Sequence, residues 1–316
     1  MLPEFNVFPY ALRVARIHVT FTARADTQFD GWIGATLRNN LLYASRQVLC
    51  QLAGGSGSLY DKLMQLPIPR SHPVYEQLKG GFPKGYTVRF DAPPDYSPQL
   101  TLKAGEALSF SVSLIGQMIS SISAFETALY RMAERGIGIG RRPFDCSLYV
   151  EPSVGIFPDY AIEGRYLRIQ FITPVSLPFK RSVVEDALSY QDKMNGFPSL
   201  YQIVKTACYR ISTLALLYGE DSEIDEDGGI YSLLDLAKEA ILEQSYLRRV
   251  LLRGAPKKEV SSRAFFEGYV GTLTFREVSP SLFRLLVAAS QVGIGSETSY
   301  GLGSFEVKSA GKVKKE

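Results

Sequence analysis

Residues 265–308 read FFEGYVGTLTFREVSPSLFRLLVAASQVGIGSETSYGLGSFEVK, and the order of elements within them points to a fold class. Residues 265–275 read as a strand. Residues 281–292 place Leu282, Leu285, Leu286 and Ala289 at the three- and four-residue steps of a helix with one buried face. The glycine-rich segment 293–303 ends this helix, and residues 304–308 are expected to form a terminal strand.

The first half of the chain repeats this order of elements. Ile17, Val19 and Phe21 alternate with polar residues within 12–22, which is the period of a strand with one buried face. The elements expected after it are a helix over 33–52, strands over 86–91 and 106–115, a helix over 118–133, the segment GIGIGRR at 136–142 and a strand over about 144–150. The second half opens in the same way, with a strand over 166–175 and a helix over 199–218.

Both halves therefore predict the βαββαβ order of a ferredoxin-like domain. A length of 316 residues fits two domains at roughly 150 residues each. We expect an α+β protein with tandem ferredoxin-like domains. The first covers 1–155 with an insertion at about 53–85, and the second covers 156–316 with a basic insertion at about 219–262. Because both helices of such a domain cover one sheet face, the two bare faces can meet in an interdomain cleft.

Composition excludes several classes of function. Hydrophobic residues make up 46% and charged residues 21%, the balance of a folded soluble protein. Three scattered cysteines, Cys50, Cys146 and Cys208, indicate no disulfide framework and a reducing compartment. With only two histidines, no metal site is expected, and no cofactor. No apolar window approaches the roughly 20 residues of a membrane span, so we expect a cytoplasmic protein with no membrane partner.

The glycine-rich segments each leave a helix and enter a strand, the reverse of a Rossmann phosphate loop. At 136–140 a helix C-cap with a tight turn stays an equal alternative to a binding loop. In 293–303, closely spaced glycines let backbone amides approach an anion, and hydroxyl side chains add donors. The candidate phosphate-binding residues of this loop are Gly293, Gly295, Ser296, Thr298, Ser299, Tyr300, Gly301 and Gly303.

The string GIGSETSYGLGSFEV at 293–307 resembles the glycine-rich signature of CRISPR-associated RAMP proteins, and most closely that of the repeat-RNA-processing endoribonucleases. The resemblance covers most of the chain, and residues 53–85 and 219–262 match least. Further similar segments are GYVGTLTF (268–275), LFRLL (282–286), FITPVSL (171–177), DGWIGATLRNNL (30–41), LSFSVSLIG (108–116) and ERGIGIGRRPF (134–144).

This resemblance implies that the chain binds CRISPR repeat RNA or crRNA, alone or with other CRISPR effector subunits. It implies metal-independent cleavage, in which a 2′-hydroxyl of the RNA attacks the adjacent phosphate and leaves a 2′,3′-cyclic phosphate. Such a reaction needs a base, an acid and positive charge. Non-catalytic RAMP subunits, which hold guide RNA without cutting it, carry related loops and are the alternative. A ferredoxin-like module without an RNA ligand is a third possibility.

The family often places a catalytic histidine near the first helix, but this sequence has none between residues 19 and 71. The two histidine candidates are His72, in the long insertion, and His18, predicted on the open face of the first strand. A solvated loop histidine and a satisfied structural histidine are the competing interpretations. Tyr43 and Lys62 are candidate proton-transfer or charge partners, against simple packing and a solvated surface.

Basic residues gather in the segment RRVLLRGAPKKEVSSR, residues 248–263. A cluster with so little acid suits a phosphate backbone, although a solvated helix end fits the pattern as well. Its candidate RNA-binding residues are Arg248, Arg249, Arg253, Lys257 and Lys258. Arg141 and Arg142, after the first glycine segment, are predicted to form a second patch that faces the cleft.

Overall fold

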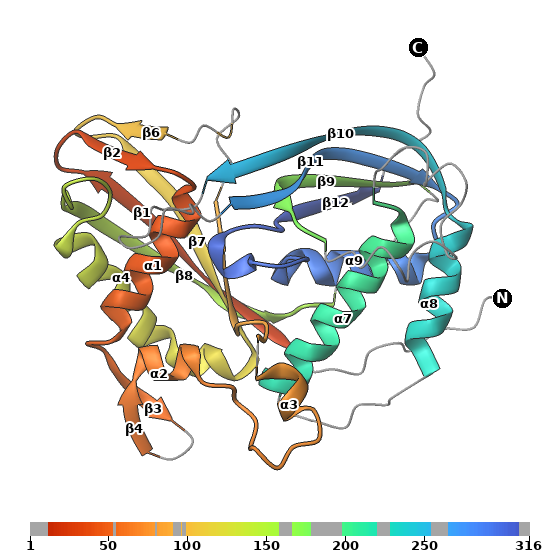
Figure 1. The fold of residues 1–316 in the computed structure, drawn as a ribbon, viewed down its shortest axis with the longest axis horizontal. Coiled ribbons are helices and arrows are strands. Elements are labelled where there is room, and N and C mark those ends of the chain that lie inside the picture. Colours follow the sequence, from red (N-terminus) through yellow and green to blue (C-terminus); the bar gives the residue numbers. More distant parts are fainter. Residues whose placement is uncertain are drawn as a thin grey trace.

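A computed structural model describes residues 12–52, 55–79, 81–90, 96, 99–157, 166–177, 198–219, 228–253 and 265–309. Within them lie two four-stranded antiparallel sheets, each covered by helices (Figure 1). The predicted fold class, tandem ferredoxin-like domains of the α+β class, is confirmed.

The first sheet has the strand order β5 (Tyr86–Arg89), β7 (Ala107–Ile115), β1 (Arg13–Ala23), β8 (Phe144–Gly155). Its two covering helices are α1 (Ile33–Ser45) and α4 (Ile122–Arg135), and α4 is preceded by the 3₁₀ helix η1 (Gly116–Ser121). On β1, Ile17, Val19 and Phe21 are buried, whereas His18 is exposed on the opposite face, as the alternation predicted. The open face of this sheet is therefore polar.

The second sheet repeats the topology in the order β10 (Ile241–Arg253), β11 (Phe265–Arg276), β9 (Tyr166–Val175), β12 (Phe305–Ser309). Its helices are α7 (Leu200–Tyr218), α8 (Gly228–Glu239) and α9 (Pro280–Val292), with the short 3₁₀ helix η2 (Thr298–Tyr300) before β12. Ser199 begins α7 through a capping box with Gln202, and Ser279 with Pro280 begins α9. Figure 1 shows α7 and α9 together on one side of this sheet.

The first domain has further short strands and helices outside its four-stranded sheet. They are the paired strands β2 (Thr27–Asp30) and β6 (Gln99–Leu102), the hairpin β3 (Leu49–Leu52) and β4 (Gly55–Ser58), and the helices α2 (Leu59–Met64) and α3 (Tyr75–Leu78). None of the helices in the described residues is long and apolar enough to cross a membrane.

Three expectations about elements need correction. The helix predicted over 33–52 ends at Ser45, where the Ser45 hydroxyl donates to the Leu42 carbonyl, and a hairpin follows. The insertion at 53–85 holds β4, α2 and α3 rather than being an irregular excursion. The basic run that starts at Arg248 begins within strand β10, not at a helix end, and 254–263 lie outside the described residues.

Candidate active site

The glycine-rich loop, residues 293–303, lines a cavity of about 640 Å³, which we call the loop cavity. Its other walls are α1, the end of α2, residues 79 and 81–84 before β5, and α7. The polar lining residues used below are Arg38, Lys84, Tyr209, Arg210, Ser296, Thr298, Ser299 and Tyr300. Both halves of the chain thus contribute to one cavity.

Most glycines of the loop are fixed by close packing against other backbone. Gly293, Gly301 and Gly303 have φ of 72°, 77° and 76°, a region that favours glycine. A Cβ on Gly303 would lie 1.9 Å from the Ile294 carbonyl oxygen, and one on Gly295 would lie 2.3 Å from that of Ser176. The glycines are therefore needed for the loop to fold back on itself.

Several loop amides are already satisfied within the protein. The Ile294 amide donates to the Gly303 carbonyl, and the Gly303 amide donates to the Pro174 carbonyl. The Ser296 amide donates to the Ser176 carbonyl, and all three distances are 3.0 Å. These three amides are therefore not free for an anion. At the cavity the loop also presents hydroxyl side chains, with cations beside them.

The loop docks on the first domain through Tyr300. The Trp32 indole Nε1 donates to the Tyr300 carbonyl at 2.7 Å, and a Cβ on Gly34 would lie 1.9 Å from the same oxygen. The Phe90 ring packs against Gly301 and lies 5.0 Å from the Trp32 ring. This contact sets the Tyr300 side chain beside α1.

Arg38 projects from α1 into the loop cavity, where its guanidinium lies 4.2 Å above the Tyr300 ring. It also bonds to the Asn39 side chain at 3.3 Å and to the Tyr86 hydroxyl. Its Nε is buried and has no protein partner among the described residues. A buried guanidinium donor with no internal acceptor suits an anionic ligand such as phosphate.

Lys84 lies two residues before β5 and is half-buried. Its Nζ lies 3.7 Å from the centroid of the Phe82 ring. Burial, and secondarily the charge of Arg38, lower the pKa of Lys84 to about 8. The backbone on either side is fixed, because the Tyr218 hydroxyl of α7 donates to the Pro83 carbonyl at 3.3 Å and Gly85 packs on the Tyr218 ring. An ammonium with this pKa is a stronger acid than an ordinary lysine.

Two further buried groups surround the cavity. Tyr86 is bonded to Ser299 and Arg38, and burial raises its pKa to about 12, which keeps its hydroxyl neutral. Arg210 of α7 donates twice to the Val292 carbonyl, at 3.1 and 3.2 Å, where α9 gives way to the loop. Burial lowers the pKa of Arg210 to about 10, so it stays charged at neutral pH. Arg210 therefore holds the start of the loop.

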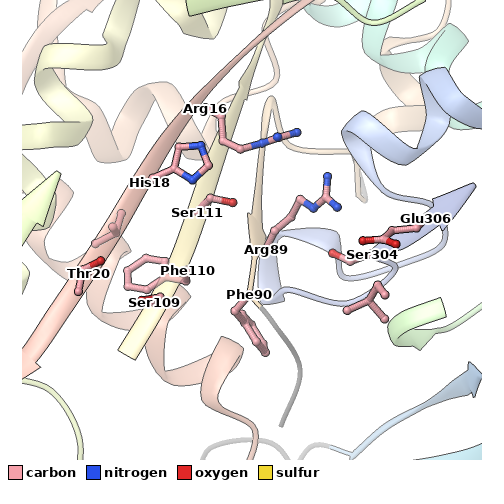
Figure 2. Close-up of a pocket in the computed structure, with 12 residues that line it drawn as sticks. Arg16, His18, Thr20, Arg89, Phe90, Ser109, Phe110, Ser111, Ser304 and Glu306 are labelled. Atoms are coloured by element: carbon pink, nitrogen blue, oxygen red, sulfur yellow. The ribbon is translucent and has the colours of Figure 1, made fainter. Parts of the chain in front are cut away.

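A second cavity, of about 500 Å³, lies between the open faces of the two sheets, where the interdomain cleft was expected. Figure 2 shows Arg16 and His18 on one strand and Arg89 on another, across from Ser304 and Glu306 of the second domain. His18 Nε2 lies 3.3 Å from a Glu151 carboxylate oxygen, and the His18 side chain is 47% exposed.

The remaining catalytic candidates lie elsewhere. His72 Nδ1 accepts from the Val74 amide at 3.3 Å, and its carbonyl accepts from the Tyr75 amide at 2.9 Å, so it shapes the start of α3. His72 is not among the residues that line the two cavities. Tyr43 is exposed on α1 beneath the Arg135 guanidinium. Lys62 donates to Ser121 at 2.8 Å.

The predicted basic patches are separate from the loop cavity. Arg141 and Arg142 are exposed in the loop after α4, which bonds to β2 through the Ile139 amide and the Gln28 carbonyl (2.7 Å). These contacts join the loop to β2 rather than to the second domain. Arg248 lies 5.1 Å from the Tyr96 ring. Arg249 pairs with Glu267, Arg253 ends β10, and Lys257 and Lys258 lie outside the described residues.

Sequence reasoning missed four groups at the loop cavity: Arg38, Lys84, Tyr86 and Arg210. One available signal was the position of Arg38 away from the apolar face of its helix. Another was a single lysine between Pro83 and Gly85, directly before a strand of buried residues. The pairing of these groups depends on the docking of two distant halves, which local patterns do not encode.

Two family models match the chain. Residues 12–152 match the AF_1859_N model, an N-terminal domain, and residues 169–305 match that of the CRISPR-associated endoribonuclease Cas6. Among curated proteins, none matches the sequence.

Solved Cas6 structures share the fold. A Cas6 product complex is 15% identical with a TM-score of 0.54, covering 92% of this chain and 98% of its own. A partial Cas6-RT-Cas1–Cas2 complex is 11% identical with a TM-score of 0.58, covering 98% of this chain and 48% of its own. Thermus thermophilus Cas6 is 11% identical with a TM-score of 0.51, covering 94% and 99%.

Two ferredoxin-like domains in tandem, with a glycine-rich loop before the last strand, form the architecture that this chain shares with the solved Cas6 structures. Because residues 169–305 match the family model, the second half of the chain contains a domain of the CRISPR-associated endoribonuclease Cas6 family.

Proposed function

We propose that this chain binds CRISPR repeat RNA and cleaves it at the loop cavity, without a metal ion, leaving a 2′,3′-cyclic phosphate. The observation that supports this most is the meeting of Arg38 and Lys84 with the hydroxyls of the glycine-rich loop in one cavity. The match of residues 169–305 to the Cas6 family model supports the substrate class, and the cavity supports the site.

The reaction needs little from the protein beyond position, charge and proton transfer, because the nucleophile belongs to the RNA. The 2′-oxygen bonds to phosphorus while the bond from phosphorus to the 5′-oxygen breaks. The 2′-proton passes to solvent, and Lys84 gives its proton to the leaving 5′-oxygen. The Arg38 guanidinium stabilises the charge on the pentavalent phosphorus.

The environment of Lys84 supports its role as the acid. With a pKa of about 8, Lys84 is mostly protonated at neutral pH and yet releases its proton more readily than a solvated lysine. Its fixed backbone and the neighbouring Arg38 hold it at the cavity wall. No separate histidine is required in this scheme.

The binding partners of this chain are proposed from the same comparisons. We propose repeat RNA as the substrate and other CRISPR proteins as further partners, since one structural neighbour is a Cas6-RT-Cas1–Cas2 complex. The Cas6 chain of that complex is longer, and this chain covers 48% of it.

A non-catalytic guide-RNA holder is the competing function. One observation favours it: none of the described residues that line the loop cavity is a histidine. In that case Arg38 and Lys84 would bind a phosphate without transferring a proton to it.

One experiment separates the two functions. The purified protein is incubated in EDTA with the repeat RNA of its own locus, and with the same RNA carrying a 2′-deoxy nucleotide at the scissile position. We expect cleavage of the first RNA, a cyclic phosphate on the product, and no cleavage of the second. Tight binding of both RNAs without cleavage would instead establish the holder.

A further inference from the structure

Three arginines on the helical side of the first domain lie over tyrosine rings. Arg38 stacks on Tyr300 at 4.2 Å, Arg46 on Tyr60 at 4.6 Å, and Arg135 on Tyr43 at 3.2 Å, each measured from the guanidinium carbon to the ring centroid. The first pair belongs to the loop cavity. The other two lie outside it.

The other two pairs extend outward from that cavity. Arg38 and Arg46 are eight residues apart on α1 and its C-cap, about 12 Å along the helix axis. Arg135 of α4 reaches Tyr43 of α1, and Arg131 of α4 donates to the Gln47 carbonyl just beyond α1 at 2.6 Å. Figure 1 shows α1 flanked by α4, with α2 beyond its end. The arginines and tyrosines of these pairs therefore come from neighbouring elements.

Among the residues that the structure describes, no acidic side chain forms an ion pair with the arginines of this surface. No carboxylate oxygen of the described residues lies within 4 Å of Arg46, Arg131 or Arg135. Elsewhere Arg24 pairs with Asp145, and Arg276 pairs with Glu243 and Glu277. Arg24 and Arg276 thus have acidic partners, whereas Arg46, Arg131 and Arg135 have none among the described residues.

A cation–π contact with a ring uses none of the N–H donors of a guanidinium in a conventional hydrogen bond. A guanidinium placed over a tyrosine ring therefore keeps donors for bidentate binding of phosphate. Tyr43 is 43% exposed and presents a polar, aromatic surface between the cations. Spaced guanidinium groups among tyrosines are complementary to a nucleic-acid backbone.

We propose that Arg46, Arg131 and Arg135, with Tyr43 and Tyr60, form a track for the phosphates of the RNA segment that flanks the cleavage point. The track begins at Arg38. This inference rests on the proposed function and extends it, because it states over which surface the substrate leaves the cavity. The track acts on binding, and the cavity acts on cleavage.

The test measures the affinity of the Arg46→Ala, Arg135→Ala double variant for repeat RNA at salt concentrations between about 50 and 200 mM. Loss of two phosphate contacts should reduce the slope of log K against log salt by about 1.4 for single-stranded RNA. The single-turnover cleavage rate at saturating protein should stay at the wild-type value. The matched control is Arg24→Ala, Arg276→Ala, which removes two ion-paired arginines and should leave the slope unchanged.

Two further measurements distinguish loss of the track from misfolding and from weaker binding at the loop cavity. The Arg46→Lys, Arg135→Lys variant keeps both charges, so it should keep the wild-type slope while binding more weakly, whereas a misfolded protein would lose both. An RNA shortened to the nucleotides around the scissile phosphate should bind the alanine variant and the wild type equally.

The proposal is overturned if the alanine variant keeps the slope and affinity of the control, or if it binds the shortened RNA more weakly than the wild type does. These outcomes are independent of catalysis. A wild-type protein that binds RNA without cutting it refutes the proposed nuclease but leaves the slope comparison valid. A protein that cuts RNA with an unchanged slope refutes the track alone.

Discussion

Single residues determine the chemistry through their surroundings. Lys84 is one lysine among many, but burial beside Arg38 lowers its pKa to about 8. In the folded protein the pKa of Lys84 is below that of a free lysine, because the environment disfavours the charged ammonium. A bound phosphate would stabilise the ammonium again. Such a group is well suited to give up a proton when the leaving oxygen becomes basic.

We therefore expect Lys84→Met to reduce the single-turnover cleavage rate by about 10²–10⁴-fold while RNA affinity changes little. Wild-type Lys84 loses its proton as the pH rises through about 8. The ratio of wild-type to Lys84→Met rates should accordingly fall between about pH 7 and about pH 9.5. Cleavage kinetics across this pH range provide the measurement.

Two variants serve as controls for Lys84. Lys103→Met removes an exposed lysine that is ion-paired with Asp26, and His72→Ala removes the turn-forming imidazole before α3. Both should cut at the wild-type rate. A constant rate ratio over the pH range would reject Lys84 as the acid, and a slow His72→Ala protein would restore His72 as a catalytic candidate.

Individual residues differ in how far their surroundings follow from the local sequence pattern. The orientation of His18 followed from alternation, because a strand with one buried face leaves no freedom in where odd and even residues point. Lys84 could not be identified in the same way. Its environment is made by Arg38 of α1, Tyr218 of α7 and the glycine-rich loop, which are brought together only by tertiary folding.

At the scale of elements, regular patterns were predictable and irregular ones were not. Residues 166–175 alternate and were assigned to a strand with the bounds observed for β9. By contrast, β10 lies at the edge of its sheet, has a register shift between Leu242 and Gln244, and alternates between exposed and half-buried residues with interruptions at 244–245 and 248–249. Such interruptions break the period of two that identifies a strand in the sequence, so the pattern predicts an insertion here.

The glycine-rich loop is the element whose placement matters most for function. Its docking depends on one hydrogen bond from the sole tryptophan, Trp32, to the Tyr300 carbonyl. Trp32→Phe keeps the ring but removes the donor and leaves a buried acceptor unpaired. We expect a loss of about 1–3 kcal/mol in the free energy of unfolding, measured by urea denaturation.

The same variant should slow cleavage more than it weakens RNA binding, because Tyr300 and its partner Arg38 lose their fixed position. Phe29→Leu, a change within the core of the first domain, is the control for a general loss of packing. If Trp32→Phe and the control affect cleavage equally for an equal loss of stability, the hydrogen bond has no special role in positioning the loop.

At the scale of the whole molecule, the two domains share one continuous hydrophobic core. Polar ties reinforce the junction: Arg16 bonds to the Gln291 side chain at 3.0 Å, and Arg89 bonds to the Ser290 carbonyl at 3.2 Å. Both reach the end of α9, directly before the glycine-rich loop. The site is built at this junction, so its geometry depends on docking of the domains as well as on the fold of each.

Phe90 provides a test of that dependence, since its ring packs on Gly301 of the second domain and on Trp32 of the first. Phe90→Ala should cost about 3–5 kcal/mol and, because the loss falls at the junction, should split a single calorimetric unfolding transition into two. Phe125→Ala removes an equally buried ring from the interior of the first domain and should lower stability without uncoupling the second. If both variants unfold in one transition, the domains are coupled by the rest of the core, and the loop contact positions the site without holding the molecule together.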